Sequence, residues 1–276
     1  MSNSPPPRLY AILAAKAPVA LVFRRGPSRW WHLLRWHLDD GRLEHGAWVK
    51  KNVYPRRWDL SPDGKLTCFY LSGAFANEHQ STRRCDVVAG VSRTPWLHPI
   101  DSWTEGDTWG RGWFFTDNEA VSAGDEQFSF QIGRQARSIR RNGIVSFLNE
   151  RRRGWREAPD SPVRDTDDMW DERRRVILQK PCPTGGYTLR LRDQPGKGID
   201  YHSPAFDVRQ PDGTFRPFDN AAWADWAPNG NLLVATVDGF LRMHDPNHDD
   251  ASPIVEHDLR SLTPDPQPAP EWAQES

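Results

Sequence analysis

The chain has 276 residues, of which 37% are hydrophobic, so it is long enough to bury a core as one large β domain or two smaller ones. Its net charge of −1 excludes a global field that would attract nucleic acid or an anionic membrane. Three cysteines without a CxxC pair or a Cys/His cluster argue against a disulfide framework and a structural zinc site.

Both ends of the chain are polar and rich in proline. Residues 1–8 and 263–276 are predicted to be disordered tails on either side of one folded domain at 9–262. The apolar stretch 10–23 is interrupted by Lys16 and Pro18, so it lacks the continuous apolar core of a signal peptide. No apolar run approaches the length of a membrane span. We therefore expect a soluble, cytoplasmic protein.

Short apolar runs alternate with turn signals along the first third of the chain. Residues 19–23 and 30–38 predict two strands, and Asp40-Gly41 after the second predicts a turn, because both residues tolerate a positive φ. A strand end at 58–60, a Pro-Asp-Gly turn and a strand at 66–71 follow.

The same order of elements recurs late in the chain. Residues 206–208 precede an Asp-Gly turn, and the strand end 223–226 precedes a Pro-Asn-Gly turn and the run 232–237. Another Asp-Gly pair then leads to the run 240–243. This internal repeat predicts repeated strand–turn–strand units.

The first repeat, Asp59-Leu60-Ser61-Pro62-Asp63-Gly64, resembles the blade motif of WD40-like and TolB-like β-propellers. Residues 225–230 match the same template, and residues 36–41 resemble the outer hairpin that precedes it. The resemblance implies an all-β fold, either an irregular β-propeller of five or six blades in a single domain or an open array of such sheets. It implies little about function, because propellers serve many functions.

The middle of the chain departs from the repeat. Residues 108–115, 127–132, 176–178 and 187–191 predict strands. Residues 134–156 fit either a helix or a hairpin that turns at Asn142-Gly143. We favour the hairpin, because an Asn-Gly pair costs a helix interior about 1–1.5 kcal/mol relative to alanine.

Tryptophan is unusually frequent, with 14 residues. Those in the repeats, Trp36, Trp58, Trp223 and Trp226, are expected to pack in the core. Those clustered outside the repeats form a candidate platform for a sugar, a base or a peptide: Trp96, Trp103, Trp109 and Trp113.

An arginine-rich stretch covers residues 134–156, where Glu150 alone opposes the basic charges. It could hold a phosphate backbone, with Arg151, Arg153 and Trp155 as candidate ligand contacts. A charged edge strand that prevents aggregation is the simpler explanation. The acidic segment that follows could also pair with it.

Evidence for an active site is sparse. His244, Asp245 and His248 could bind a divalent metal, but Pro-Asn directly after a strand predicts a plain surface turn. Asp59 and Asp225 hold matching repeat positions, and we expect each to cap its own turn rather than to form a catalytic pair. With no nucleophile motif, phosphate-cradling loop or HExxH, we assign no catalytic residue, metal or cofactor.

The expected function is a non-catalytic scaffold or recognition module that binds a protein or peptide partner. One alternative is a glycan-binding or glycan-hydrolysing propeller that uses the tryptophan cluster. The other is a nucleic-acid-binding accessory protein that uses the arginine stretch.

Overall fold

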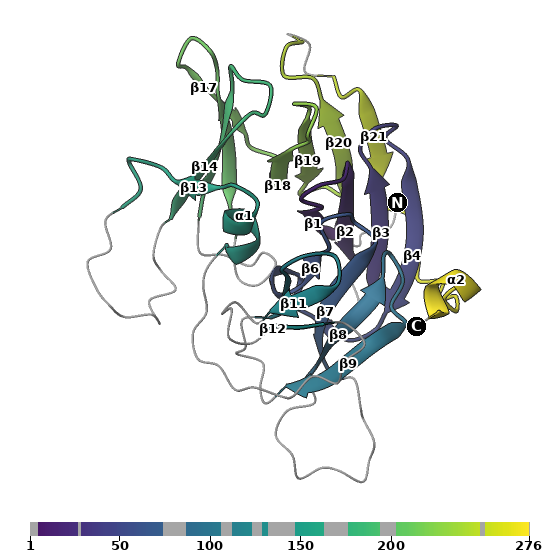
Figure 1. Ribbon diagram of the computed structural model, residues 1–276. Helices are drawn as coiled ribbons and strands as arrows, with labels where there is room; N and C mark the ends of the chain where they lie inside the picture. The colour runs from purple at the N-terminus through teal and green to yellow at the C-terminus, as the bar shows by residue number, and fades with distance from the viewer. Residues whose placement is uncertain are drawn as a thin grey trace. The chain divides into compact units, whose positions relative to one another are not determined.

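Five antiparallel sheets hold about half of the described residues (Figure 1). The computed structural model describes residues 5–26, 29–73, 87–105, 112–122, 129–131, 147–162, 176–193, 203–248 and 252–275. Each sheet is built from strands that follow one another along the chain. The all-β fold class predicted from the sequence is confirmed, and α-helix is confined, among the described residues, to α1 (Leu148–Arg152) and α2 (Glu271–Gln274).

The chain divides into two compact units. Unit 1 comprises Met1–Ala11 and Glu150–Thr263, and unit 2 comprises Ile12–Asn149 and Pro264–Ser276. The single domain expected at 9–262 stays a prediction.

The first three sheets come from the first half of the chain. The first has the order β1-β2-β3-β4, with strands at Arg8–Leu13, Val19–Arg25, Trp31–His37 and Leu43–Val49. The second has the order β5-β7-β8-β9, with β6 also paired to β7; its strands are Asn52–Val53, Asp59–Leu60, Leu66–Ser72, Val87–Arg93 and Pro99–Glu105. A 3-10 turn, η1, spans Pro55–Arg57. The third sheet holds β10 (Phe114–Phe115), β11 (Ala120–Ser122) and β12 (Ser129–Gln131).

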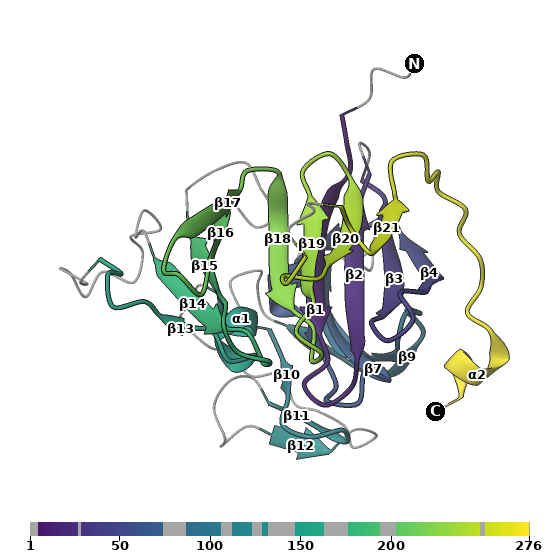
Figure 2. The ribbon, with the colours of Figure 1, turned by 90° about the horizontal axis from the view of Figure 1, so that it is seen from above.

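The fourth and fifth sheets belong to unit 1. The fourth runs β13 to β17, with strands at Arg156–Glu157, Ile177–Pro181, Thr188–Arg192, Ala205–Arg209 and Phe215–Phe218. The fifth runs β18 to β21, with strands at Ala221–Trp226, Leu232–Thr236, Phe240–His244 and Val255–Asp258. Figure 2 shows its four strands side by side.

The two repeats fold as the sequence predicts. In the first, Ser61 and Leu66 are joined by a backbone hydrogen bond of 2.8 Å, and Gly64 has a φ of +74°. In the second, Ala227 donates to Asn231 at 2.9 Å, and Gly230 has a φ of +89°. Each turn therefore uses its glycine where an L side chain would be strained.

Tryptophan fills the core of unit 2. Trp58 is fully buried, and its indole Nε1 donates to the Tyr70 carbonyl at 2.8 Å. The ring of Phe23 meets it edge-on, 5.1 Å between centroids. Such aromatic pairs contribute about 0.5–1.5 kcal/mol beyond the area they bury. The other repeat tryptophans, Trp36, Trp223 and Trp226, are also buried, which confirms their expected place.

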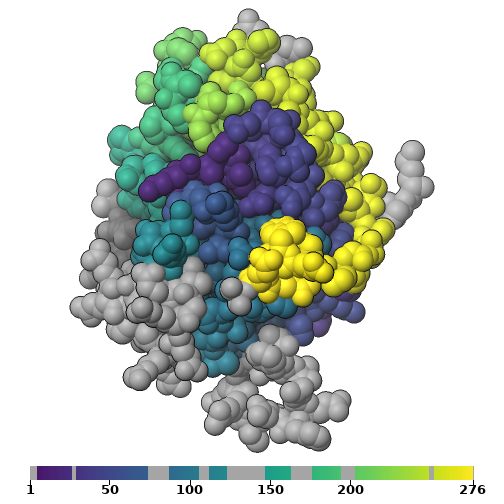
Figure 3. All heavy atoms as spheres, turned by 45° about the vertical axis from the view of Figure 1, so that its right-hand side comes forward, coloured from purple at the N-terminus to yellow at the C-terminus, as the bar shows by residue number. Residues whose placement is uncertain are grey.

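The C-terminal segment holds more structure than a disordered tail would. Helix α2 packs against β8 of the same unit, with Ala273 fully buried. The Arg93 guanidinium donates to the Glu275 carbonyl at 3.3 Å. Figure 3 shows this helix, in yellow, lying on the surface of unit 2.

Two further observations bear on the sequence predictions. The hairpin turn expected at Asn142-Gly143 lies outside the described residues, while 148–152, within the same stretch 134–156, is α-helical. Among the described residues, no helix combines the length and apolar character needed to cross a bilayer.

Replacing Gly230 by alanine should destabilise the protein more than the same change at Gly185. Both residues have a φ near +88°, at +89° and +87°, so both alanine variants lose about 1 kcal/mol through backbone strain. A Cβ at Gly230 would also overlap the Thr184 side chain, with Cγ2 at 2.9 Å, whereas a Cβ at Gly185 meets nothing within 4 Å. Urea unfolding of the two variants measures the difference, and equal losses would contradict the overlap argument.

A buried histidine should make unit 2 sensitive to acid. Burial, with His45 and Arg24 nearby, lowers the pKa of His32 from 6.5 to about 3, and its ring stacks on Trp48 at 4.1 Å. Between pH 6.5 and about pH 3, His32 is protonated in the unfolded chain but not in the folded chain. The unfolding free energy should therefore fall by up to about 1.4 kcal/mol for each pH unit in this range. His32→Phe keeps the ring stack and should flatten this slope in urea titrations between pH 3 and 7. An unchanged slope would assign the sensitivity to another group.

Candidate functional site

Asp225, the repeat acid of unit 1, is the centre of a buried polar cluster. Its Oδ1 lies 2.6 Å from the Lys180 Nζ and accepts the Trp226 backbone N–H at 2.7 Å. Its Oδ2 accepts the Trp155 indole N–H at 3.3 Å. The Trp226 indole in turn donates to the Lys180 carbonyl at 3.0 Å. One carboxylate thus joins β14, β18 and the segment before β13.

Asp59, the matching acid of unit 2, plays a similar part. Its Oδ2 accepts the Phe115 backbone N–H at 2.8 Å, which links β6 to β10 across 56 residues of sequence. Beside it, the Asn149 side-chain amide donates to the Trp58 carbonyl at 3.0 Å. We expected both acids to cap their own turns. Asp225 does accept the N–H of the next residue, and both carboxylates also bind donors of other segments. Both acids are buried and engaged in structural bonds.

The predicted tryptophan cluster is partly brought together, but inside the protein. Trp103 and Trp113 are buried and pack edge-to-face with centroids 4.9 Å apart. Both indole N–H groups donate to the Glu105 Oε1, at 3.0 and 2.6 Å. Trp96 is half-buried, and Trp109 lies outside the described residues.

The described part of the arginine stretch includes an ion pair, a half-buried arginine and a buried tryptophan. Arg151 pairs with Glu157 at 2.7 Å, and Arg153 is half-buried. Trp155 is buried against Asp225. Residues 132–146, which carry four of the arginines, lie outside the described residues.

A pocket of about 350 Å³ lies between the fourth and fifth sheets, within unit 1. This volume is within the range of about 300–1,000 Å³ that is typical of ligand sites. Its floor is apolar, formed by buried side chains of Val208, Trp226, Leu232 and Val234. Polar and aromatic side chains surround it: Tyr187, Gln210, Arg216, Phe218, Asn220 and His244. The arrangement suits a ligand with an apolar group to insert and polar groups to orient.

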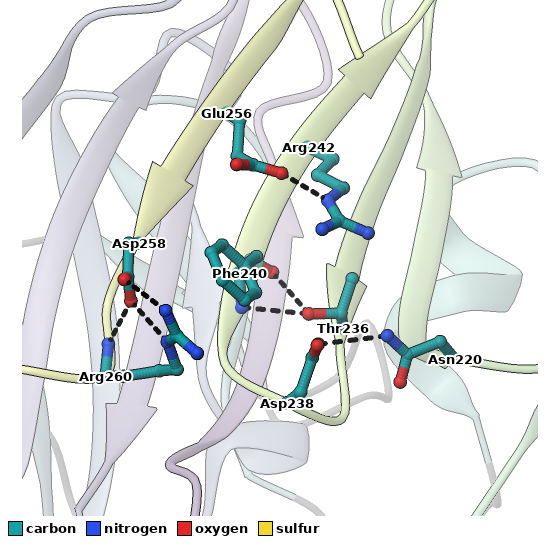
Figure 4. Close-up of polar contacts among 8 residues, drawn as sticks. All are labelled: Asn220, Thr236, Asp238, Phe240, Arg242, Glu256, Asp258 and Arg260. Atoms are coloured by element: carbon teal, nitrogen blue, oxygen red, sulfur yellow. Dashed lines mark hydrogen bonds and ion pairs between the residues drawn. The ribbon is translucent and has the colours of Figure 1, made fainter. Parts of the chain in front are cut away.

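Several polar groups around the pocket are already engaged (Figure 4). The Arg242 Nε pairs with Glu256 at 2.7 Å, and the Asn220 amide donates to Asp238 at 3.0 Å. Although partial burial acts to raise the pKa of Asp238, hydrogen bonds from Thr236 and Asn220 outweigh it and hold that pKa below its usual value. These contacts fix the wall of the pocket formed by β19 and β20.

Asp258, at the end of the edge strand β21 of the fifth sheet, is held as an anion. The Arg260 guanidinium and the Arg260 backbone N–H both donate to it and lower its pKa to about 2 (Figure 4). The Arg260 guanidinium also lies 4.4 Å from the Phe240 ring centroid. This cluster is polar and solvated, and it stabilises the edge strand β21.

The His–Asp run flagged in the sequence belongs to the pocket. His244, Asp245 and His248 all line it. The Asp245 carboxylate accepts from the Asn247 backbone N–H at 2.9 Å and lies 3.1 Å from the His248 Nδ1, and the Asn247 bond is the main cause that lowers the pKa of Asp245. Among the described residues, no group of three or more His, Cys, Asp or Glu side chains is arranged to hold a metal ion.

Strand β17 lies at the edge of the fourth sheet and forms one side of the pocket. Gln210 and Thr214 form a hydrogen-bonded pair at 2.8 Å. Because antiparallel pairs alternate, the registered partners Asp207 and Pro217 form a non-hydrogen-bonded pair. The nitrogen of Pro217 therefore faces the open edge, where it costs the sheet no bond and offers no N–H to an added strand.

Comparison with known proteins identifies no family. No family model matches the chain, and no curated protein matches its sequence. Among solved structures, the hydrazine synthase of Kuenenia stuttgartiensis is similar at 11% identity, over 88% of this chain and 77% of that chain, with a TM-score of 0.34. A score this low carries no information on fold or function.

The pocket was missed from the sequence, because its lining comes from five strands and their turns. One signal was present: the run from His244 to His248 is dense in ligand-type side chains. This run could not be assigned to a pocket from sequence, because the other side of the pocket comes from β17. The pairing of β17 with β16 brings Arg216 and Phe218 to the same pocket.

Replacing Asp225 by asparagine should strongly destabilise the protein. The change leaves the Lys180 ammonium, 15% exposed, without its carboxylate, and breaking a buried ion pair costs about 3–5 kcal/mol. Glu256→Gln, which breaks the more exposed pair with Arg242, should cost less than about 1 kcal/mol. Urea unfolding of both variants tests this.

The double variant Lys180→Met with Asp225→Asn removes both charges and should recover part of the loss. If Asp225→Asn lowered the unfolding free energy no more than Glu256→Gln does, the Asp225 cluster would not be important for stability.

Proposed function

We propose that the chain is a non-catalytic recognition module that binds a peptide segment of a partner protein in the pocket between the fourth and fifth sheets. The observation that carries the proposal is the combination, in one concave site, of an apolar floor with a polar, aromatic rim. The blocked edge at Pro217 supports recognition by side chains in the pocket rather than by an added strand.

We also propose that the sheets are blades of a WD40-like or TolB-like propeller of five or six blades. Support comes from their construction, since each is an antiparallel sheet of consecutive strands and the two repeats occupy matching strand pairs, β6–β7 and β18–β19. A cytoplasmic location remains a proposal that rests on the sparse cysteines, of which Cys68 and Cys182 are free and buried.

The alternative functions draw less support from the described residues. A glycan platform needs exposed tryptophan faces, whereas Trp103 and Trp113 are buried against each other. A phosphate-binding strip needs available arginines, whereas Arg151 is paired with Glu157.

A pocket-filling variant tests the proposed function. Gln210→Trp places a bulky side chain at the half-buried rim and should abolish the binding of peptides selected by the wild-type protein from a library of short random peptides. Arg209→Trp is the matched control, because this exposed neighbour lies outside the pocket lining and points to the opposite face of the sheet. Fluorescence anisotropy with labelled peptides gives the affinities. Failure to select any peptide, or equal binding by both variants, would contradict the proposal.

A further inference from the structure

We infer that the occupant of the pocket is an acidic peptide segment, with a side-chain carboxylate bound at Arg216 and a neighbouring apolar side chain on the pocket floor. The inference rests on the proposed function and specifies its ligand. It follows from the charged side chains of the pocket lining, some of which are paired with a neighbour and some of which are not.

Arg216 is the cation of the pocket lining that has no acidic partner among the described residues. It lies in the middle of β17, is exposed, and its guanidinium is 5.7 Å from the Phe218 ring centroid. The other lining arginine, Arg242, is paired with Glu256. A guanidinium positioned over an aromatic ring keeps its donors available for a carboxylate, which it can bind in bidentate fashion.

The two acids of the lining differ in how far they oppose such a ligand. Asp245 accepts bonds from Asn247 and lies 3.1 Å from the His248 Nδ1, so its oxygens already have donors. Asp219 is exposed and only three residues from Arg216 along the chain. It would repel an acidic ligand, which makes it a built-in test of charge.

The apolar part of the ligand follows from the floor. Trp226, Leu232 and Val234 line the pocket and are 2–3% exposed, so its base is built from apolar core side chains. The half-buried rings of Phe218 and His244 stand edge-to-face with centroids 6.4 Å apart at its margin. An aliphatic or aromatic side chain adjacent to the carboxylate fits this division into apolar floor and basic rim.

The test selects short random peptides on the full-length protein and then compares each selected peptide with a copy in which Glu and Asp are replaced by Gln and Asn. The selected peptides should be acidic, and the neutral copies should bind wild type about tenfold or more weakly, as expected for a hydrogen bond to a charged group. Arg216→Ala should weaken the acidic peptides to the level of the neutral copies and should not discriminate between the two. Asp219→Asn should leave acidic-peptide affinity equal or higher.

Arg209→Ala, an exposed arginine on the same sheet but outside the pocket, is the matched control and should leave affinity unchanged. If pocket-dependent peptides are neutral or basic, or if Arg216→Ala binds them normally, the inference is wrong while the proposed function stands. If Gln210→Trp does not block the selected peptides, the proposed function itself fails. An anionic oligonucleotide that displaces the peptides and binds more tightly would assign the site to another class of ligand and also overturn the inference.

Discussion

The buried carboxylate of Asp225 is the constraint on which the organisation of unit 1 depends. A charge in an apolar interior is tolerated only when its bonds are satisfied, and Asp225 is satisfied by an ammonium, an indole and a backbone amide from three segments. These donors can meet only if β14, β18 and the segment at Trp155 hold one arrangement. Trp226, fixed by the cluster through both its backbone and its ring, is part of the pocket floor. The bonds of Asp225 therefore fix the position of Trp226 and, with it, the floor of the candidate site.

Unit 2 uses the same residue type at the same repeat position for a different partner. Asp59 binds a backbone N–H in β10, where Asp225 binds Lys180 and Trp155. The repeat thus conserves a position for a buried acceptor within one chain, while the donor varies with the segment that packs against it. Such a plan explains why local sequence is alike in the two repeats although their surroundings are not.

Local features of the fold were predictable from sequence, and features that depend on distant pairing were not. The Pro-Asp/Asn-Gly turns were predictable because glycine tolerates a positive φ, which Gly64 and Gly230 have. The buried tryptophans were predictable from their place in apolar strands. The role of Asp225 could not be predicted, because Lys180 lies 45 residues away and nothing in the sequence indicates the pairing. The tryptophan platform looked plausible because residue type says nothing about exposure, and Glu105 draws both indoles inward.

The proline in β17 bears on how the proposed ligand preference could change. If the pocket binds a peptide as proposed, Pro217 removes a backbone donor from that edge, and selectivity then depends on rim side chains such as exposed Arg216 and half-buried Gln210. Side chains of this kind can be exchanged one at a time without altering strand register or the buried cluster below. The scaffold would then permit changes of ligand preference by single surface substitutions, with the fold acting as an invariant support.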